Sequence, residues 1–509
     1  MTRSPLRAAA LVLTALSLQS CGGAGADPSA TIANLEALSG VGQGAPIGRS
    51  LPEPLVVRAT DEEGNPISGQ RIEFSVTIGN GQVAPEVATT GSDGRASTTF
   101  TVGSTKGNHQ VQAVAAGTEF SATFDVLASG PPAVLEVAAG TGQSALPSSA
   151  VSVAPAVRVL DDQDDPAPGV EVQFAVAVGG GSVSGALATT DLEGIARVQG
   201  WTLGNSGVNT LTATVPDEGL AGDPALFVAT VRPATGFNIE VRHQGSPSAA
   251  QLLAFAEAEV RWEQVIAADI PDLQVVASPG DCGPGSPALS EQVDDLLILA
   301  NLIPIDGPGS VLGAAGPCFI RQPGSLPVVG QMRFDTDDLD LLEGNDILRV
   351  VILHEMGHVL GFGTMWKTLG LLADASIPGG ADPHFTGPLA VAAFNGAGGA
   401  GYTGGKVPVE DTGGQGTADS HWRESVFDTE LMTGFIGPGV NPMSAITLQS
   451  LADMGYSVNL SAADSYTLGA ALRLGGSVAS RGFELHDDIA RGPIYILDER
   501  GATVGTVTR

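Results

Sequence analysis

The sequence predicts a multidomain protein in which two all-β sandwich modules precede an α+β domain. A chain of 509 residues is too long to fold around one compact core. Residue types in the N-terminal half recur at a constant offset of 100 positions, which indicates tandem modules. After residue 233, long helical patterns occur for the first time, between apolar runs that predict strands. The 69 glycines and 33 prolines also favour a β-rich, loop-rich protein.

The repeat places the two modules at residues 31–128 and 132–232. Its matching pairs are Val57 and Val157, Asp61 and Asp161, Pro66 and Pro166, Gly69 and Gly169, Phe74 and Phe174, and Gly94 and Gly194. An offset of 100 is the size of one β-sandwich, and residues 71–76 and 170–176 alternate polar and apolar as half-buried strands do. The pair resembles bacterial immunoglobulin-like domains of the invasin and intimin type. The resemblance implies immunoglobulin-like sandwiches, here without the antibody-type disulfide because neither module contains cysteine.

The first 30 residues predict an export signal and a tether. Arg3 and Arg7 precede an apolar run at residues 8–18, which is shorter than the roughly 18 residues that a membrane-spanning helix needs. The stretch Leu18-Gln19-Ser20-Cys21-Gly22 resembles a bacterial lipoprotein signal, and this resemblance implies a lipid on Cys21. Residues 1–21 would then be the signal peptide and 22–30 the tether. We expect an exported lipoprotein at the cell surface or periplasmic face; an ordinary secretory signal and a secreted protein are the alternative.

Charge and cysteine usage limit the partners. Acidic residues outnumber basic ones 55 to 23, giving a net charge of −32, so we expect no nucleic-acid partner and no general attraction to anionic lipid. Besides Cys21, the chain contains Cys282 and Cys318. In an exported protein this pair predicts one disulfide; two free thiols or two metal ligands are the alternatives.

The α+β domain is expected at residues 235–463. The patterns predict a helix at 249–270, a buried strand at 296–305, a strand at 331–335 at a sheet edge, and a helix at 346–362 capped by Asn345. Residues 363–421 are glycine-rich with little pattern, and 445–454 predict a last helix. Residues 464–509 predict a small C-terminal β appendage.

The helix at 346–362 carries the motif His354-Glu355-Met356-Gly357-His358. Residues i and i+4 lie on one face of a helix, so His354 and His358 can present two imidazoles to one metal ion. Glu355 can then reach a water at that ion without binding the metal itself. This arrangement predicts one catalytic Zn²⁺, with zinc activating the water and Glu355 taking its proton as general base.

A catalytic zinc needs a third protein ligand. Gly361 allows the chain to turn after the helix, but Thr364 stands where the compact pattern has its third histidine. The first glutamate after the motif, Glu410, comes too late for a thermolysin-like pattern. The downstream histidines are His384, His421 and His486.

The stretch from His421 to Met432 resembles the third-ligand and Met-turn segment of the leishmanolysin family of metzincins. Met432 follows His421 by 11 positions, as in that family, and Leu451-Ala452-Asp453-Met454-Gly455-Tyr456 also matches. The resemblance covers roughly residues 240–460. It implies a metzincin-type catalytic domain with a long insertion from Gly361 to His421, with His354, His358 and His421 as ligands and Met432 as the floor beneath the metal.

Other assignments stay open at this point. Met443 competes with Met432 for the Met-turn, and His384 is the reserve third ligand. His109, His243 and His486 are expected to be structural or solvated. The chain lacks the many cysteines of leishmanolysin and an evident propeptide, so we do not expect a cysteine switch.

The sequence therefore predicts a zinc-dependent endopeptidase that hydrolyses peptide bonds in protein or peptide substrates at the cell surface. The rival hypothesis is a surface adhesin whose peptidase domain is degenerate or structural. The tandem sandwiches favour the rival, whereas the intact Glu355 argues against it, because a structural metal site does not need that residue.

Overall fold

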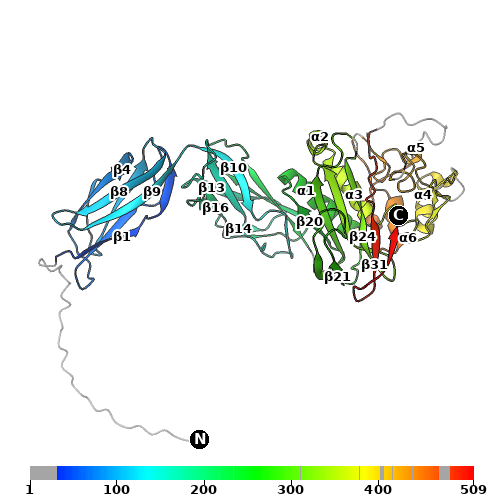
Figure 1. The fold of residues 1–509 in the computed structure, drawn as a ribbon, viewed down its shortest axis with the longest axis horizontal. Helices are drawn as coiled ribbons and strands as arrows, with labels where there is room; N and C mark the ends of the chain where they lie inside the picture. Colours follow the sequence, from blue (N-terminus) through cyan, green and yellow to red (C-terminus); the bar gives the residue numbers. More distant parts are fainter. Residues whose placement is uncertain are drawn as a thin grey trace, which may run out of the picture. The chain divides into compact units, whose positions relative to one another are not determined.

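The computed structural model describes residues 31–508 except 217, 233, 310, 378, 402–405, 415, 438 and 469–481. The expected signal peptide, the whole of the expected tether and Cys21 lie outside the described residues. The chain divides into two compact units (Figure 1). Unit 1 comprises Met1–Val134, Val159–Val170 and Thr189–Ile195, and unit 2 comprises Leu135–Arg158, Glu171–Ala188 and Ala196–Arg509.

The first module is all β. Its sheets have the strand orders β1-β3-β7-β5 and β2-β9-β8-β4-β6. The strands are β1 Asn34–Ser39, β2 Gln43–Pro46, β3 Leu55–Thr60, β4 Arg71–Ile78, β5 Gly81–Ala84, β6 Val87–Thr89, β7 Arg95–Val102, β8 Gly107–Ala115 and β9 Ser121–Ser129.

The second module is also all β, with the orders β10-β12-β16, β11-β19-β18-β13-β15 and β14-β17. Its strands are β10 Pro132–Ala139, β11 Gln143–Ala145, β12 Ala156–Asp161, β13 Glu171–Val178, β14 Ser182–Ser184, β15 Leu187–Thr189, β16 Ile195–Arg197, β17 Gly200–Thr202, β18 Val208–Thr214 and β19 Ala225–Val231. The sequence repeat is visible in the structure, because β4 and β13 have the same alternation of buried and exposed residues. Phe74 and Phe174 are buried at equivalent positions.

A six-stranded mixed sheet organises the α+β region, with the order β20-β23-β25-β24-β31-β32 (Figure 1). Its strands are β20 Ile239–Gln244, β23 Leu296–Ile303, β24 Gly313–Arg321, β25 Pro327–Asp335, β31 Pro493–Leu497 and β32 Thr503–Thr508. The buried strand expected at 296–305 is confirmed as β23. The edge position expected for 331–335 is wrong, because β25 pairs on both sides, parallel to β23 and antiparallel to β24.

The C-terminal residues form β structure, but the expectation of an appendage at 464–509 is wrong. β31 runs parallel to β24, pairing Phe319 with Tyr495, and β32 is antiparallel to β31. The chain end therefore extends the central sheet. The sequence pattern shows that a stretch is extended, but it does not show which distant strand will accept its backbone hydrogen bonds.

Three helices correspond to predicted ones. α1 Ala249–Val265 starts at Ser248 with a capping box completed by Gln251, and it ends before 270 because Ile266 is extended and bridges to Val458. α3 Leu348–Val359 carries the motif. The cap expected at Asn345 is wrong: Asn345 ends a preceding short helix, α2 Leu339–Gly344. α6 Ala445–Met454 has the predicted bounds.

The α+β region also contains short elements outside the central sheet and the three predicted helices. The remaining elements of this region are β21 Leu273–Ala277, β22 Leu289–Val293, β26 Leu372–Ala373, β27 His384–Phe385, α4 Pro388–Gly396, η1 Gly399–Gly401, β28 Val407–Pro408, α5 Glu424–Phe427, β29 Phe435–Ile436, η2 Leu460–Ala462 and β30 Phe483–Glu484. Among the described helices, none has the length and apolar character needed to cross a membrane.

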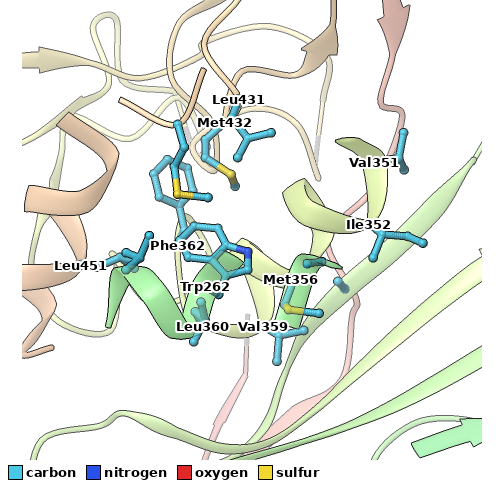
Figure 2. Close-up of a cluster of buried hydrophobic side chains, with 14 of the residues drawn as sticks. Trp262, Val351, Ile352, Met356, Val359, Leu360, Phe362, Leu431, Met432 and Leu451 are labelled. Atoms are coloured by element: carbon cyan, nitrogen blue, oxygen red, sulfur yellow. The ribbon is translucent and has the colours of Figure 1, made fainter. Parts of the chain in front are cut away.

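The motif helix α3 is embedded in the main apolar core (Figure 2). Ile352, Met356 and Val359 are fully buried, and the indole N–H of Trp262 on α1 donates to the backbone carbonyl of Leu353 at 2.9 Å. Burial of each large apolar side chain contributes about 1.5–3 kcal/mol. This packing holds the polar face of α3 in one place, which a metal site requires.

Candidate metal centre

The centre is built first by α3, which places His354 and His358 one turn apart. Both imidazoles are fully buried, and their Nε2 atoms lie 2.9 Å apart. Gly361, with φ of +106°, ends the helix, as the sequence predicts. The backbone then passes so close to Ser420 that a side chain at Gly363 would overlap the carbonyl oxygen of Ser420. This contact brings the distant His421 loop against the end of α3.

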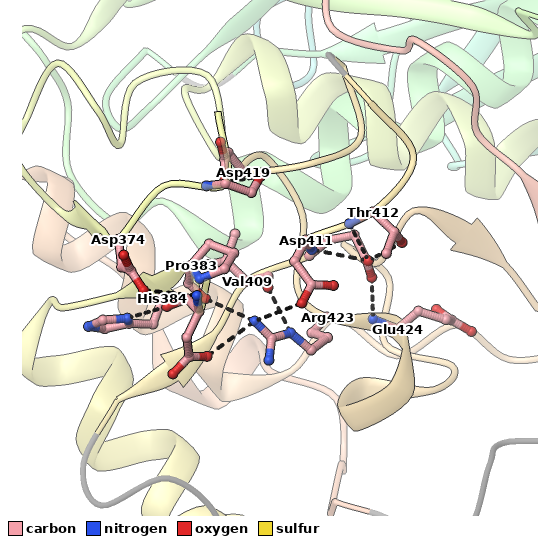
Figure 3. Close-up of polar contacts among 12 residues, drawn as sticks. Asp374, Pro383, His384, Val409, Asp411, Thr412, Asp419, Arg423 and Glu424 are labelled. Atoms are coloured by element: carbon pink, nitrogen blue, oxygen red, sulfur yellow. Dashed lines mark hydrogen bonds and ion pairs between the residues drawn. The ribbon is translucent and has the colours of Figure 1, made fainter. Parts of the chain in front are cut away.

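His421 completes a set of three imidazoles. Its Nε2 atom lies 3.2 Å from Nε2 of His354 and 3.0 Å from Nε2 of His358, and its side chain is fully buried. A polar network holds the loop in this position. The backbone N–H of Glu410 donates to the His421 carbonyl, and the Glu410 carboxylate accepts from the N–H of Glu424 (Figure 3).

The second nitrogen of each ring shows which atoms are free to bind a cation. Each Nδ1 atom contacts a backbone carbonyl, and because a carbonyl only accepts, Nδ1 carries the proton and Nε2 carries the lone pair. The accepting carbonyls are those of Leu431 for His354 at 2.7 Å, Phe362 for His358 at 2.9 Å and Thr417 for His421 at 2.9 Å. Three acceptor nitrogens thus converge with no proton between them, which suits a shared cation.

Asp488 is a fourth group at the same point, and the sequence analysis did not select it. Its Oδ2 atom lies 2.9 Å from Nε2 of His421, 3.4 Å from that of His354 and 3.8 Å from that of His358. The side chain is only 1% exposed. Three histidines and one carboxylate, each offering one atom within 4.8 Å of the others, form a complete set of zinc-type ligands.

Burial and charge act on the pKa values of these groups. Burial lowers the pKa of His354, and it lowers the pKa of His358 well below the usual range, so both favour the neutral form. Burial also acts to lower the pKa of His421, but the negative charge of Asp488 and the polar contacts of the ring with Asp488 and the Thr417 carbonyl together outweigh it and raise that pKa. Burial alone would raise the pKa of Asp488, yet the nearby imidazoles hold it well below its usual range.

Glu355 lies beside this group on α3. It is fully buried, and neither carboxylate oxygen has a hydrogen-bond partner among the described residues. Burial, followed by the charge of Asp488, raises the pKa of Glu355 well above its usual range. A buried carboxyl without internal partners is suited to exchange a proton with a small molecule at the centre.

Met432 lies against the motif helix, as the Met-turn assignment requires (Figure 2). A Cβ atom on Gly357 would lie 2.9 Å from Cε of Met432, so the glycine leaves room for this side chain. The competing candidate Met443 is also buried, but it immediately precedes the start of α6, and its N–H donates to Asp464. Of the two candidates, Met432 is the one whose side chain lies next to Gly357 of the motif.

The sequence analysis also gave no role to Glu430, which holds the Met-turn. Its buried carboxylate accepts from the N–H groups of Met432 and Ser444 at 2.7 and 3.0 Å. It also accepts from the hydroxyls of Ser444 and Thr447 at 2.7 and 2.5 Å. Thr447 in turn accepts the indole N–H of Trp422, the neighbour of His421. One carboxylate thereby ties α6, the Met-turn and the His421 loop together.

The reserve ligand His384 is not part of the metal group. It lies on β27, and its Nδ1 donates to the carbonyl of Asp382 at 2.7 Å, near the polar network of Arg423 (Figure 3). His109 is buried in the first module, with its ring contacting Thr105. His243 packs on Phe255, and burial lowers its pKa to about 4. His486 is exposed, near Glu484.

The disulfide predicted between Cys282 and Cys318 is present, with the Cα atoms 5.2 Å apart. It links the end of the loop after β21 to the central strand β24. Both cysteines are buried in a satellite apolar cluster beside the sheet. The alternatives of free thiols or metal ligands are therefore excluded for this pair.

Comparisons with known families agree with both regions of the chain. The family model for leishmanolysin matches residues 286–475, which include the three histidines, Glu355 and Met432. The model for the bacterial Ig-like domain (group 1) matches residues 52–126 of the first module. Both predicted family resemblances are therefore confirmed, and Asp488 lies beyond the matched residues.

Solved structures similar to parts of the chain include the D0-D1 domain of intimin, at 19% identity over 39% of this chain and 95% of that one, with a TM-score of 0.17. The Yersinia pseudotuberculosis adhesin InvE is 20% identical over 40% of this chain and 61% of that one, with a TM-score of 0.20. The Escherichia coli adhesin FdeC is 20% identical over 39% and 63%, with a TM-score of 0.19. TM-scores this low support no argument. A comparison with curated proteins found no match.

Proposed function

We propose that the α+β region is a zinc-dependent endopeptidase of the metzincin type that hydrolyses peptide bonds in proteins. One observation carries the proposal: three fully buried imidazoles bring their Nε2 atoms within 2.9–3.2 Å of one another, while each Nδ1 lies in hydrogen-bond contact with a backbone carbonyl, which leaves the lone pair on Nε2. Lone pairs placed this way repel unless they share a cation. Buried polar groups without compensation cost several kcal/mol, so the arrangement is stable only with a metal.

The residues then have separate roles. His354, His358 and His421 hold the metal, and the carbonyls that accept from their Nδ1 atoms fix each ring in the ligand tautomer. Zinc, when bound, lowers the pKa of water and polarises a carbonyl group. Glu355 takes a proton from the attacking water and returns it to the leaving amine, because it lies next to the ligands with both oxygens unpartnered.

Export is part of the same proposal. Cys21 would carry the lipid that attaches the protein to the membrane, at the cell surface or periplasmic face. The two immunoglobulin-like modules would then serve as spacers or substrate-binding arms for the peptidase. The match of the first module to the bacterial Ig-like family supports this role.

The test measures zinc content and casein hydrolysis of the native chain, Glu355→Ala and Asp488→Ala. The last variant is included because Asp488 lies against the histidines. We expect about one zinc per chain in the native protein and in Glu355→Ala, and a loss of cleavage of at least about 100-fold in Glu355→Ala. Zinc-replete protein that cleaves nothing both as the native chain and as Asp488→Ala would contradict peptidase activity and favour the adhesin alternative.

A further inference from the structure

The segment at residues 482–491 binds to the central sheet next to the metal centre. The N–H of Ala315 on β24 donates to the carbonyl of Asp488 at 2.7 Å, and the N–H of Ala490 donates to the carbonyl of Ala315 at 2.8 Å. These bonds continue the parallel pairing of β24 with β31. The segment therefore occupies the side of β24 that would otherwise be a sheet edge, which is the place where an extended peptide can add as a strand.

Close contacts at two glycines hold the N-terminal half of the segment. Gly482 faces the carbonyl of Ile436, and any side chain at 482 would overlap that oxygen. Gly416, on the loop before His421, has no side chain, and Asp487 occupies the space that a side chain there would fill. Ile489 also lines a cavity of about 200 Å³ together with residues of the His421 loop.

The Asp488 carboxylate is buried against the three imidazoles. Neither of its oxygens has a hydrogen-bond partner among the described residues, and a buried carboxylate without hydrogen bonds is costly. Its Oδ2 atom lies within 2.9–3.8 Å of all three Nε2 atoms. A metal shared with the histidines satisfies the carboxylate and the three rings at once.

A catalytic zinc keeps one position free for water, whereas a zinc with four protein ligands is a closed, structural type of site. We propose that Asp488 is the fourth protein ligand of the metal, and that residues 482–491 thereby hold the peptidase in a closed, inactive state. This inference rests on the proposed function. The closed state blocks two requirements of catalysis. Asp488 takes the coordination position that a catalytic zinc keeps for water, and the segment covers the edge of β24 where an extended substrate can bind. Activity requires that the segment leave this site.

The experiment uses the full chain loaded with cobalt(II), whose visible absorption reports its ligands. Azide is the probe for a free coordination position. In the native protein we expect azide to leave the spectrum unchanged and casein cleavage to be slow. In Asp488→Ala, azide should change the spectrum, the metal should be lost to a chelator at least tenfold more readily, and casein cleavage should rise at least tenfold.

Two further variants separate the ligand from the segment. Asp488→Asn preserves the size of the side chain and removes its charge, so its result does not depend on altered packing. Gly482→Val should displace the segment from Ile436 without changing any ligand, and it should open the site in the same way. Glu499→Gln is the control, since it removes a charge from an exposed position in the turn between β31 and β32, outside the segment; it should behave as the native protein.

The outcomes distinguish the two proposals. A native cobalt protein that responds to azide and cleaves casein as fast as the Asp488 variants would overturn the closed state. Variants that respond to azide when the native protein does not, yet cleave no casein, would uphold Asp488 as a ligand and contradict the peptidase function instead.

Discussion

Helix α3 and the segment at residues 482–491 both place side chains at the metal centre, yet different interactions hold them there. α3 is surrounded by the main apolar core, and its two histidines are fixed by the backbone carbonyls of Leu431 and Phe362. The segment is added at the edge of β24 through backbone hydrogen bonds and close glycine contacts. From this difference we expect that His354 and His358 stay at the centre as long as the domain is folded, whereas Asp488 can leave it when the segment detaches from β24.

The largest expected effect comes from the general base on α3. In an Asp488→Ala background, which removes the fourth ligand, Glu355→Gln should lower the casein-cleavage rate about 10²- to 10⁴-fold while zinc content stays unchanged. Glu499→Gln, at an exposed position of the same domain, is the control. Cleavage that persists in Glu355→Gln would show that Glu355 is not the general base, and that α3 contributes only the metal ligands His354 and His358.

A substitution of Glu430 tests how strongly its hydrogen bonds stabilise the Met-turn. Glu430→Gln keeps the volume but replaces an acceptor of four hydrogen bonds by a group that must also donate. We expect the free energy of unfolding to fall by about 2–4 kcal/mol. Denaturant unfolding of the variant and the native chain measures this difference in the free energy of unfolding. A change below about 0.5 kcal/mol would show that the Met-turn does not depend on this carboxylate.

Gly357 tests the contact between the motif and Met432. Gly357→Ala places a Cβ atom 2.9 Å from Cε and 3.0 Å from Sδ of Met432, so overpacking should cost about 1–3 kcal/mol despite the better helix propensity of alanine. Gly344→Ala on α2 is the matched control, because nothing lies within 4 Å of its Cβ position. That variant should be neutral or more stable by up to about 1 kcal/mol. Thermal unfolding compares the stabilities of the two variants. Equal effects would mean that Met432 leaves enough room for a side chain at Gly357.

The smallest expected effect concerns pH. Burial raises the pKa of Glu263 on α1 to about 7, from an ordinary value of 4.5. The folded state therefore holds the proton more tightly, and this stabilisation is present below pH 4.5 and is lost as pH rises through 7. Glu263→Gln preserves the acceptor for the N–H of Ile239 and should gain about 1–3 kcal/mol relative to the native chain between pH 4.5 and 8. Denaturant unfolding at several pH values measures it, with Glu499→Gln as the control; a pH-independent difference would contradict this account.

The part of the site that local geometry determines could be predicted from the sequence. His354 and His358 follow from the i and i+4 spacing on one helix, and Glu355 follows from its place between them. His421 could not be derived this way, because the chain between Gly361 and His421 has little pattern. Its identification depended on the family resemblance, and the structure then places its ring against the other two.

Asp488 could not be predicted, because its position depends on which strand the C-terminal residues pair with. Nothing in the residues around Asp488 indicates pairing with β24, so the sequence predicts an appendage there instead. The edge position expected for residues 331–335 failed for a similar reason. An alternating pattern shows which face of a strand is buried, but the order of strands in a sheet depends on long-range contacts.

The most direct measurement is the zinc content of the native chain beside His421→Ala and His384→Ala, two single-histidine changes in the same inserted region. The account predicts about one zinc per chain in the native protein and in His384→Ala, and a loss of stoichiometric zinc in His421→Ala. Stoichiometric zinc retained in His421→Ala, or lost in His384→Ala, would contradict the three-histidine centre.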